Sequence, residues 1–415
     1  MDIGIVAPPS SPGFPDSGRE RGYPKGRPMH FDFLARNNAR RRGATVIFTL
    51  VTIFVLIGFA SLTLDVGALY GVRGDLQNAV DAAALSGASM LASDAMVKVR
   101  ANSNESFGEI SSTIFNRAQD VGLRHTSFGA SGTVLASSDV VPGWIDLASS
   151  TSAINTGVSA STFNAVRVFA SRSQESANGA VQFYFASIFG MSEGDVSASA
   201  TAAYDDRVSG YDTDAGGAPF LPFSIRLTEY DAQVAAGSDI YDYDPSTDNV
   251  SSGSDDIPEV NLYPSGIGPG NFGAIAINHN GSVPPMREDI EEGVSPEDWE
   301  DEIGTSTLSF YDDSGNPTTY SIPGNTGLSA TLQSSIETVI GEVAAFMVHD
   351  QVTGNGSNLV YRVTGIRFGR VMGVRLTGNS KGLWIQPVSY AGSGVIVATS
   401  APSSGGAAGR IVLVR

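Results

Sequence analysis

The chain has 415 residues, a net charge of −18 and no cysteine. The acidic balance argues against nucleic-acid binding, which needs a basic surface against phosphate. The absence of cysteine excludes disulfides and thiolate metal sites, and the length allows two or three domains.

The first 43 residues form a basic leader. Eight basic and four acidic residues lie in this segment, which leaves +4 there and −22 on the remainder of the chain. Proline, glycine, serine and charged residues dominate it with little apolar periodicity, so it cannot bury much surface. We predict a disordered cytoplasmic tail over residues 1–43.

An uncharged apolar run, ATVIFTLVTIFVLIGFASLTL, follows from Ala44 to Leu64. As a helix this run rises about 31 Å, which matches a hydrocarbon core of about 30 Å. A cleaved signal peptide has a shorter apolar region, and SLTLDVGAL offers no clean small-x-small cleavage site. We therefore predict a retained transmembrane helix over residues 44–64.

The orientation follows from Arg40, Arg41 and Arg42, which stand directly before the run. Basic residues next to a span stay on the cytoplasmic side. We expect a single-pass protein of the cytoplasmic (inner) membrane whose acidic bulk is periplasmic or extracytoplasmic. The lipid bilayer is then its first partner.

A helix rich in small residues is predicted over residues 65–92. An apolar stripe recurs there at spacings of three or four, and small residues let another backbone approach closely. The predicted helix-packing residues are Gly67, Gly71, Gly74, Leu76, Val80, Ala83 and Gly87. Two interpretations stay open: the helix docks on a helix of another protein, or it packs on the chain's own exported domain.

The order of residues around the span is characteristic. Arg-Arg-Gly, the span, Asp65-Val66-Gly67, Tyr70, Leu76-Gln77 and the run DAAALSGA at 81–88 follow one another. In residue types, spacing and position, the chain resembles the TadE/TadG-like proteins of the tight-adherence (Tad, Flp) pilus system, and most of all their TadG-like members. The resemblance implies a structural or assembly role, no enzyme activity, and other Tad/Flp pilus or pseudopilin components as partners.

One position departs from the prepilin-like relatives. These place Glu at the fifth position after a glycine cleavage site, and counting from Gly43 that position is Phe48. The departure argues against cleavage at Gly43 and favours a permanent anchor.

Residues 93–214 are predicted to form an α/β exported domain. We expect a polar helix end and linker over 93–130, strands at 133–137, 163–172 and 195–206, and a helix at 180–191 from its helical apolar spacing. The blocks AVRVFASRSQ, FYFASIFG and DVSASATAAY are similar to the core of TadG-like exported domains, which extends the resemblance to about residue 205.

Residues 215–415 are predicted to form a β-rich exported domain. Helices are expected at 295–303 and 326–346, and strands at 359–378, 382–390, 394–399 and 410–415. The predicted fold class is therefore α+β. A single N-terminal transmembrane helix continues into a long amphipathic helix, and a mainly β exported region with a few helices follows.

An acidic loop carries the candidate metal ligands Asp242, Asp244 and Asp248. Such oxygen clusters suit Ca²⁺, but the spacing does not match an EF-hand. We expect a solvated acidic loop and no metal.

Other motifs are weak. GPGNFG at 268–273 satisfies G-x-G-x-x-G, yet a strand-like segment follows it instead of a helix. DVSAS at 195–199 matches the metal-dependent adhesion motif D-x-S-x-S without the apolar strand that should precede it. The four histidines His30, His125, His279 and His349 fall in no zinc-protease motif. We predict no catalytic residue, no cofactor and no small-molecule substrate.

The expected function is a membrane-anchored structural or assembly component of a Tad (Flp-type) pilus or related secretion system, which acts through its exported domain and could form homo-oligomers. Two alternatives stay open: a membrane-anchored extracytoplasmic binding module or adhesin, which could depend on Ca²⁺, and an anchored exported hydrolase.

Overall fold

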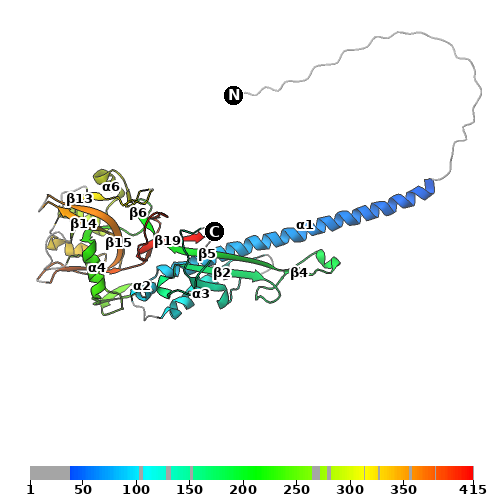
Figure 1. Cartoon of the computed structure of the whole chain (residues 1–415), viewed down its shortest axis with the longest axis horizontal. Coiled ribbons are helices and arrows are strands. Elements are labelled where there is room, and N and C mark those ends of the chain that lie inside the picture. The colour runs from blue at the N-terminus through cyan, green and yellow to red at the C-terminus, as the bar shows by residue number, and fades with distance from the viewer. Residues whose placement is uncertain are drawn as a thin grey trace, which may run out of the picture. The chain divides into compact units, whose positions relative to one another are not determined.

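The structure is a computed structural model of the chain. It describes residues 38–101, 106–127, 132–149, 153–263, 272–277, 282–312, 314–325, 328–354, 358–378 and 380–414. Residues 1–37 of the predicted tail lie outside these ranges, whereas residues 38–43, predicted to be disordered, belong to a helix. The predicted α+β class is confirmed, because one long apolar helix is followed by many strands and a few helices (Figure 1). The chain divides into two compact units, Met1–Ala60 and Ser61–Arg415.

The first described element is helix α1 (Asn38–Ser89), in which residues 44–60 carry no charge and expose large apolar side chains. Phe48 and Phe54 are 76% and 65% exposed there. Thr49 and Thr52 donate hydrogen bonds of 2.9 Å to backbone carbonyls one turn earlier, which satisfies their hydroxyls without water. The helix is long and apolar enough to cross a membrane.

The second half of α1 is buried on one face. This face contributes to a core shared with helices α2 (Asp94–Ala101) and α3 (Phe107–Arg124) and with the first sheet. The hydroxyl of Ser106 caps α3 by accepting the N–H of Gly108 at 3.2 Å. The fully buried α1 residues of this core are Val72, Leu76, Val80, Ala83, Ala84 and Ala88.

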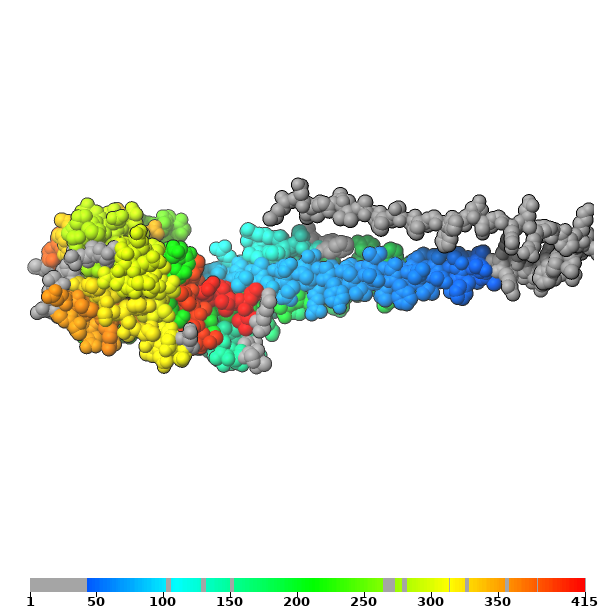
Figure 2. Space-filling model, turned by 90° about the horizontal axis from the view of Figure 1, so that it is seen from above, coloured from blue at the N-terminus to red at the C-terminus, as the bar shows by residue number. Residues whose placement is uncertain are grey.

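The first sheet has the strand order β1-β2-β5-β19-β17. Its strands are β1 (Val140–Gly143), β2 (Ala165–Arg172), β5 (Val196–Asp205), β17 (Tyr390–Ala391) and β19 (Ala408–Val414). The last strand of the chain therefore completes the sheet that packs on α1, since β19 pairs antiparallel with β5. Ile411 and Leu413 pack against the same core, and the red C-terminal atoms lie beside α1 in Figure 2.

The second sheet contains a closed ring of strands. Strand β15 pairs with β13 along one edge and with β14 along the other, while β14 pairs in parallel with β7. The order β15-β13-β11-β7-β14 therefore returns to β15, and β16 and β10 extend it. The strands are β7 (Phe220–Arg226), β10 (Val260–Asn261), β11 (Phe272–Ile275), β13 (Tyr320–Asn325), β14 (Val343–Thr353), β15 (Leu359–Arg375) and β16 (Gly382–Pro387).

The two faces of the ring belong to two cores. Along β14, Ala345 and Met347 pack into one core, and Ala344, Phe346 and Val348 into the other, as strand alternation requires. Helices α4 (Leu227–Ala236), α5 (Val283–Glu291) and α7 (Gln333–Glu337) pack on the second face.

Smaller elements complete the fold. They are the sheet of β12 (Thr307–Ser309), β6 (Val208–Asp212) and β18 (Val395–Val397), the hairpin of β3 (Val181–Gln182) and β4 (Glu193–Gly194), the hairpin of β8 (Tyr241–Asp244) and β9 (Asn249–Ser252), helix α6 (Pro296–Ile303), and the 3₁₀ turns η1 (Met90–Ala92), η2 (Ser137–Asp139), η3 (Ala160–Thr162), η4 (Ala186–Phe189) and η5 (Ala330–Leu332).

Several predicted elements are confirmed. The strands expected at 163–172, 195–206, 359–378, 382–390, 394–399 and 410–415 are β2, β5, β15, β16, β18 and β19, and the helix expected at 295–303 is α6. The domain boundaries drawn at 92 and 214 stay predictions.

Two predicted helices are wrong. In its described part, the segment 326–346 holds η5 and the short helix α7, and its apolar end is the start of β14 beyond Gly341, whose φ of 96° ends the turn. The segment 180–191 holds one 3₁₀ turn between β3 and β4, which ends at Gly190 with φ 85°. Pairing with distant strands decides the first case, and contacts described below decide the second.

Two further expectations are wrong. The segment 133–137 forms no strand, because side chains satisfy its backbone: Val134 N–H donates to Asn178 and Leu135 N–H to Gln119, each at 2.7 Å. The segment 93–130 is not chiefly a linker, since α2 and α3 occupy most of its described part.

Glu259, just before β10, is a buried acid in the second unit. It is 2% exposed, and its carboxylate accepts N–H groups from Ile240 at 2.8 Å and Tyr241 at 3.2 Å. Burial raises the pKa of Glu259 to about 7 against the pull of these two donors.

The free energy of unfolding should therefore depend on pH through Glu259. Between its ordinary pKa of 4.5 and about 7, the folded chain holds a proton that the unfolded chain has released, so stability is full below 4.5 and falls as pH rises through 7. Glu259→Gln should remove this pH dependence. At about 1.4 kcal/mol per pKa unit, the free energy of unfolding that depends on Glu259 amounts to at most about 3 kcal/mol. Urea denaturation of the full-length protein in detergent at acidic and basic pH measures it.

The exposed Glu300→Gln is the matched control and should keep the parent slope. An unchanged slope in Glu259→Gln would contradict the prediction.

Candidate functional site

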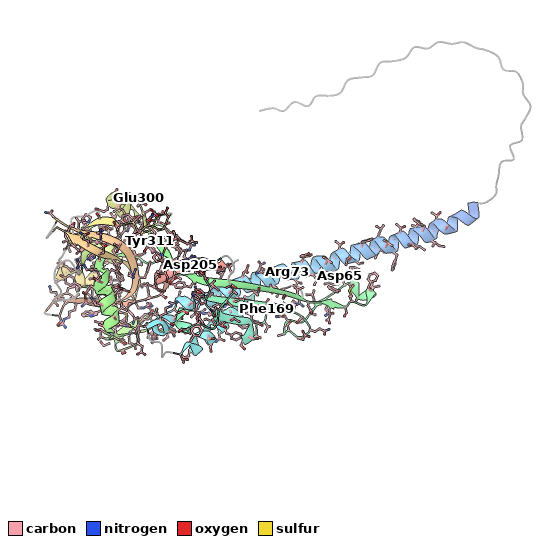
Figure 3. All side chains as sticks on the ribbon, viewed as in Figure 1. Asp65, Arg73, Phe169, Asp205, Glu300 and Tyr311 are labelled. Carbon is pink, nitrogen blue, oxygen red and sulfur yellow. The ribbon has the colours of Figure 1, made fainter. Side chains whose placement is uncertain are left out.

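Asp65 is the first charged residue after the apolar run, and its side chain is buried (2% exposed). Its carboxylate accepts three successive backbone N–H groups: Tyr184 at 2.8 Å, Phe185 at 3.1 Å and Ala186 at 2.6 Å. Hydrogen bonds to an ionised acceptor are among the strong ones. They fix the hairpin β3–β4 on α1 directly after the apolar run, where Figure 3 labels Asp65.

The hairpin folds so that these donors converge. β3 and β4 pair antiparallel, and the N–H of Phe183 bonds to the carbonyl of Ser192 at 2.9 Å. The turn η4 then begins at Ala186, and Met191 N–H returns to its carbonyl at 3.1 Å. The first N–H groups of a helical turn lack partners within the turn, so an acidic side chain is a fitting acceptor.

Four of the predicted helix-packing residues face the chain's own core. Leu76, Val80 and Ala83 have no exposed surface. A Cβ added to Gly87 would lie 3.3 Å from Val166 Cγ1, so the glycine admits β2 at close range. This side of α1 is therefore occupied by the protein itself.

The other three residues lie on the opposite side of α1. Gly67, Gly71 and Gly74 are exposed, and a Cβ added to any of them would meet nothing within 4 Å. Their spacing of four and three places them on one helical face, about half a turn away from Leu76. A shallow cavity of about 460 Å³ lies on another side of α1, where Val66, Leu69, Tyr70 and Arg73 face the start of β5.

That cavity includes the first residues of the D-x-S-x-S motif. Asp195, Ser197 and Ser199 are exposed at the start of β5, and the Ser199 carbonyl accepts Gln77 Nε2 at 3.2 Å. Residues 197 and 199 lie in the paired part of β5, opposite Ser171 and Phe169 of β2.

The acidic candidates lie on the β8–β9 hairpin. Asp244 accepts the N–H and hydroxyl of Ser246 and the hydroxyl of Thr247, and these hydrogen bonds lower its pKa. Asp248 accepts Tyr243 OH at 2.9 Å, and Asp242 sits on β8. These bonds shape the turn, and within the described residues no three acidic or histidine side chains gather as a metal site.

One serine–histidine pair bears on the hydrolase alternative. Ser224 Oγ and His349 Nδ1 lie 2.8 Å apart, and both residues have no exposed surface. The His349 ring also lies 4.5 Å from the Tyr361 ring. A substrate could reach this pair only if the strand ring opened, so the pair fits a satisfied polar contact inside the core.

A polar junction joins α2 to the C-terminal segment. Arg100 donates to Ser389 Oγ at 2.7 Å and to the carbonyls of Leu91 at 2.9 Å and Gly406 at 3.3 Å, and its guanidinium lies 5.6 Å from the Tyr204 ring centre. Nothing in the sequence pattern singles out Arg100.

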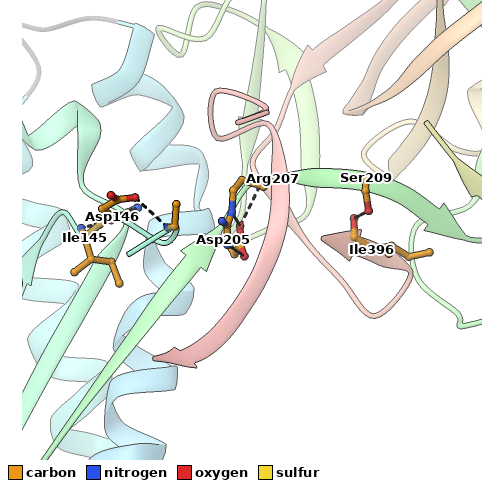
Figure 4. A network of polar contacts seen from close by, with 8 residues as sticks. Ile145, Asp146, Asp205, Arg207, Ser209 and Ile396 are labelled. Atoms are coloured by element: carbon orange, nitrogen blue, oxygen red, sulfur yellow. Dashed lines mark hydrogen bonds and ion pairs between the residues drawn. The ribbon is translucent and has the colours of Figure 1, made fainter. Parts of the chain in front are cut away.

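Next to this junction Arg207 forms a bidentate pair with Asp205, at 2.9 and 2.8 Å (Figure 4). A cavity of about 550 Å³ lies here, and its described lining holds no histidine. The arrangement links α2, the end of β5 and the C-terminal segment.

Sequence reasoning missed the clamp at Asp65 because its donors lie 119 to 121 residues away. In the sequence, Asp65 shows only where the apolar run ends, and nothing nearby indicates which groups bind its carboxylate. The spacing of apolar residues over 180–191 predicts a longer helix, because nothing local indicates that residues 184–186 bind Asp65.

Two family models match the chain. Residues 43–90 match a TadE/G-like Flp pilus-assembly family, and residues 73–202 match a Tad-like Flp pilus-assembly family. These segments hold the apolar run, Asp65 and the hairpin that it binds. No curated relative and no solved structure matched in the corresponding comparisons. The predicted resemblance to TadG-like Flp/Tad pilus-assembly proteins is confirmed over residues 43–202.

Asp65→Asn should loosen the β3–β4 hairpin. The amide cannot accept three N–H groups, and its own NH₂ would face one of them, so the amides of residues 184–186 should exchange hydrogen faster by about tenfold. Hydrogen exchange of the full-length protein in detergent, read by mass spectrometry, measures this. Asp195→Asn, an exposed acid beyond β4, is the control; equal exchange in both variants would refute the clamp.

Proposed function

We propose that this chain, whose residues 43–202 carry the signature of TadG-like Flp pilus-assembly proteins, is a membrane-anchored scaffold for a Flp-type pilus or a related secretion system. The observation that carries the proposal is that the matched segments include the long apolar helix α1. Both families are pilus-assembly families by description, which favours a structural role over catalysis.

The anchoring follows from the two halves of α1. Residues 44–64 are uncharged, and the large side chains among them are exposed, as a lipid-facing helix requires. Arg40, Arg41 and Arg42 place the N-terminus in the cytoplasm by the positive-inside rule, which puts the acidic remainder of the chain on the far side of the inner membrane.

The partner-binding element is the open face of Gly67, Gly71 and Gly74. The opposite face of the helix is used by the chain's own core, so this face remains for a second backbone. Small residues permit the close approach that helix pairs use at a membrane. The partner is a helix of another Tad/Flp pilus or pseudopilin component, or a second copy of the chain.

Protease added to intact spheroplasts should test the orientation. The C-terminal unit should be digested, while the tail before Arg40 should survive until detergent is added, because the bilayer shields the cytoplasmic side. Immunoblots against tags at the two ends measure the two fates. A protected C-terminal tag beside a digested N-terminal tag would refute the proposed topology.

Gly71→Leu should reduce pilus assembly and crosslinking to the partner by about tenfold, because the side chain blocks backbone approach. The protein itself should remain folded, since a Cβ added at Gly71 would meet nothing within 4 Å and leucine favours helix over glycine by roughly 0.8 kcal/mol. Filament counts by electron microscopy and crosslink yields in membranes measure the loss.

Arg73→Leu is the control, because it adds the same side chain at an exposed position on another side of α1. It should leave assembly unchanged. Normal filaments and crosslinks in Gly71→Leu would remove this face from the proposal.

A further inference from the structure

The tip of the β3–β4 hairpin presents large apolar side chains to the outside. Tyr184, Ile188, Phe189 and Met191 are 62%, 73%, 59% and 55% exposed. No charged residue lies between Phe183 and Met191. Soluble surfaces seldom gather such side chains on one short turn, so the tip is suited to a partner that offers an apolar environment.

The position of the tip is fixed by the clamp. The N–H groups of Tyr184 and Ala186 lie 2.8 and 2.6 Å from the Asp65 carboxylate, so the turn η4 begins level with the first residue after the apolar run. Ser61, one helical turn earlier, is already buried (5% exposed). Protein therefore already covers one face of α1 in the last turn of the apolar run, about 6 Å from Asp65 along the helix axis towards the N-terminus.

The turn is too short to leave this level. Its four residues rise by about 8 Å in total at roughly 2 Å each, so Ile188 and Phe189 stay within about 8 Å of the level of Asp65. The headgroup zone between water and hydrocarbon has a similar thickness, about 5–8 Å on each side. A helix whose apolar run ends at Leu64 holds the hairpin tip in that zone.

We infer that residues 184–191 form a second membrane contact, which inserts into the outer face of the bilayer beside the span. The inference rests on the proposed membrane anchorage of α1. Ile188 and Phe189 enter the boundary of the acyl chains, and Tyr184 lies at the headgroup level where its hydroxyl finds water. Glu193, on β4, stays on the aqueous side.

A lipid surface fits the tip better than a protein groove does. The four side chains stand at the end of a hairpin, and their backbone donors are already used by Asp65 or within the turn. The contact is continuous with the span, which the bilayer already surrounds. The tip carries no basic residue, so its insertion does not depend on anionic lipid.

The chain lacks cysteine, so single-cysteine variants can report depth directly. The full-length variants Ile188→Cys and Phe189→Cys are labelled with the environment-sensitive fluorophore NBD and reconstituted into vesicles of phosphatidylethanolamine and phosphatidylglycerol. Phe54→Cys is the control inside the span, and Ile240→Cys is the control on an exposed apolar residue (48%) before β8. Quenching by iodide in water is compared with quenching by a nitroxide on the lipid acyl chain.

The labels at 188 and 189 should be quenched at least about threefold more by the lipid nitroxide than the label at 240, and should emit at shorter wavelength. Iodide quenching at 188 and 189 equal to that at 240, while the label at 54 stays in lipid, would overturn the second contact and leave the anchor intact. Protection from both quenchers would assign the tip to a protein surface instead. A label at 54 that is quenched by iodide would overturn the anchor and this inference together.

Discussion

Helix α1 has to satisfy two different surroundings within one unbroken helix. Between Ala44 and Ala60 α1 carries no charge and its large apolar side chains are exposed, and from Ser61 one face is buried in protein. Asp65 stands where the change occurs. A carboxylate exposed to hydrocarbon is costly, whereas here three backbone N–H groups replace the water that it loses. Because the donors belong to the β3–β4 hairpin, the same contact decides where that hairpin lies.

On the same face of α1 as Asp65, the residues that follow it pack into the core of the second unit. Leu76, Val80 and Ala83 continue the buried stripe, and Gly87 lets β2 approach. The glycines 67, 71 and 74 lie on the other side because a helix turns by about 100° per residue. The seven residues that one sequence pattern groups together thus divide between internal packing and an open face.

Both large sheets are completed by contacts between segments that are distant in the sequence. Strand β19 returns to pair with β5, and Arg100 of α2 holds the carbonyl of Gly406 just before that strand. The long strand β15 closes the second sheet into a ring by pairing on both edges, which places Ser224 and His349 inside it. A serine and a histidine that could suggest catalysis therefore serve to satisfy each other in the core.

Several elements of the fold can be predicted from patterns among neighbouring residues. The apolar run before Asp65 and the alternation in β2, β5 and β15 predict their elements, because a long uncharged run and an alternating pattern are both carried by residues that are neighbours in the chain. The sequence predicts a helix over 180–191 and another over 326–346, yet neither segment forms one continuous helix. In the first, Asp65 and the β3–β4 pairing stop the helix after one turn, and in the second, β14 pairs with β15 and β7.

The sequence by itself determined the apolar run that is long enough to cross a membrane, its basic flank, the α+β class and the resemblance to TadG-like proteins, since each depends on residues close together in the chain. Only the tertiary structure decided which face of α1 is open, which backbone groups Asp65 binds, and where the last strand goes. Those outcomes depend on which segments, more than a hundred residues apart, meet in space, and no local period records that meeting.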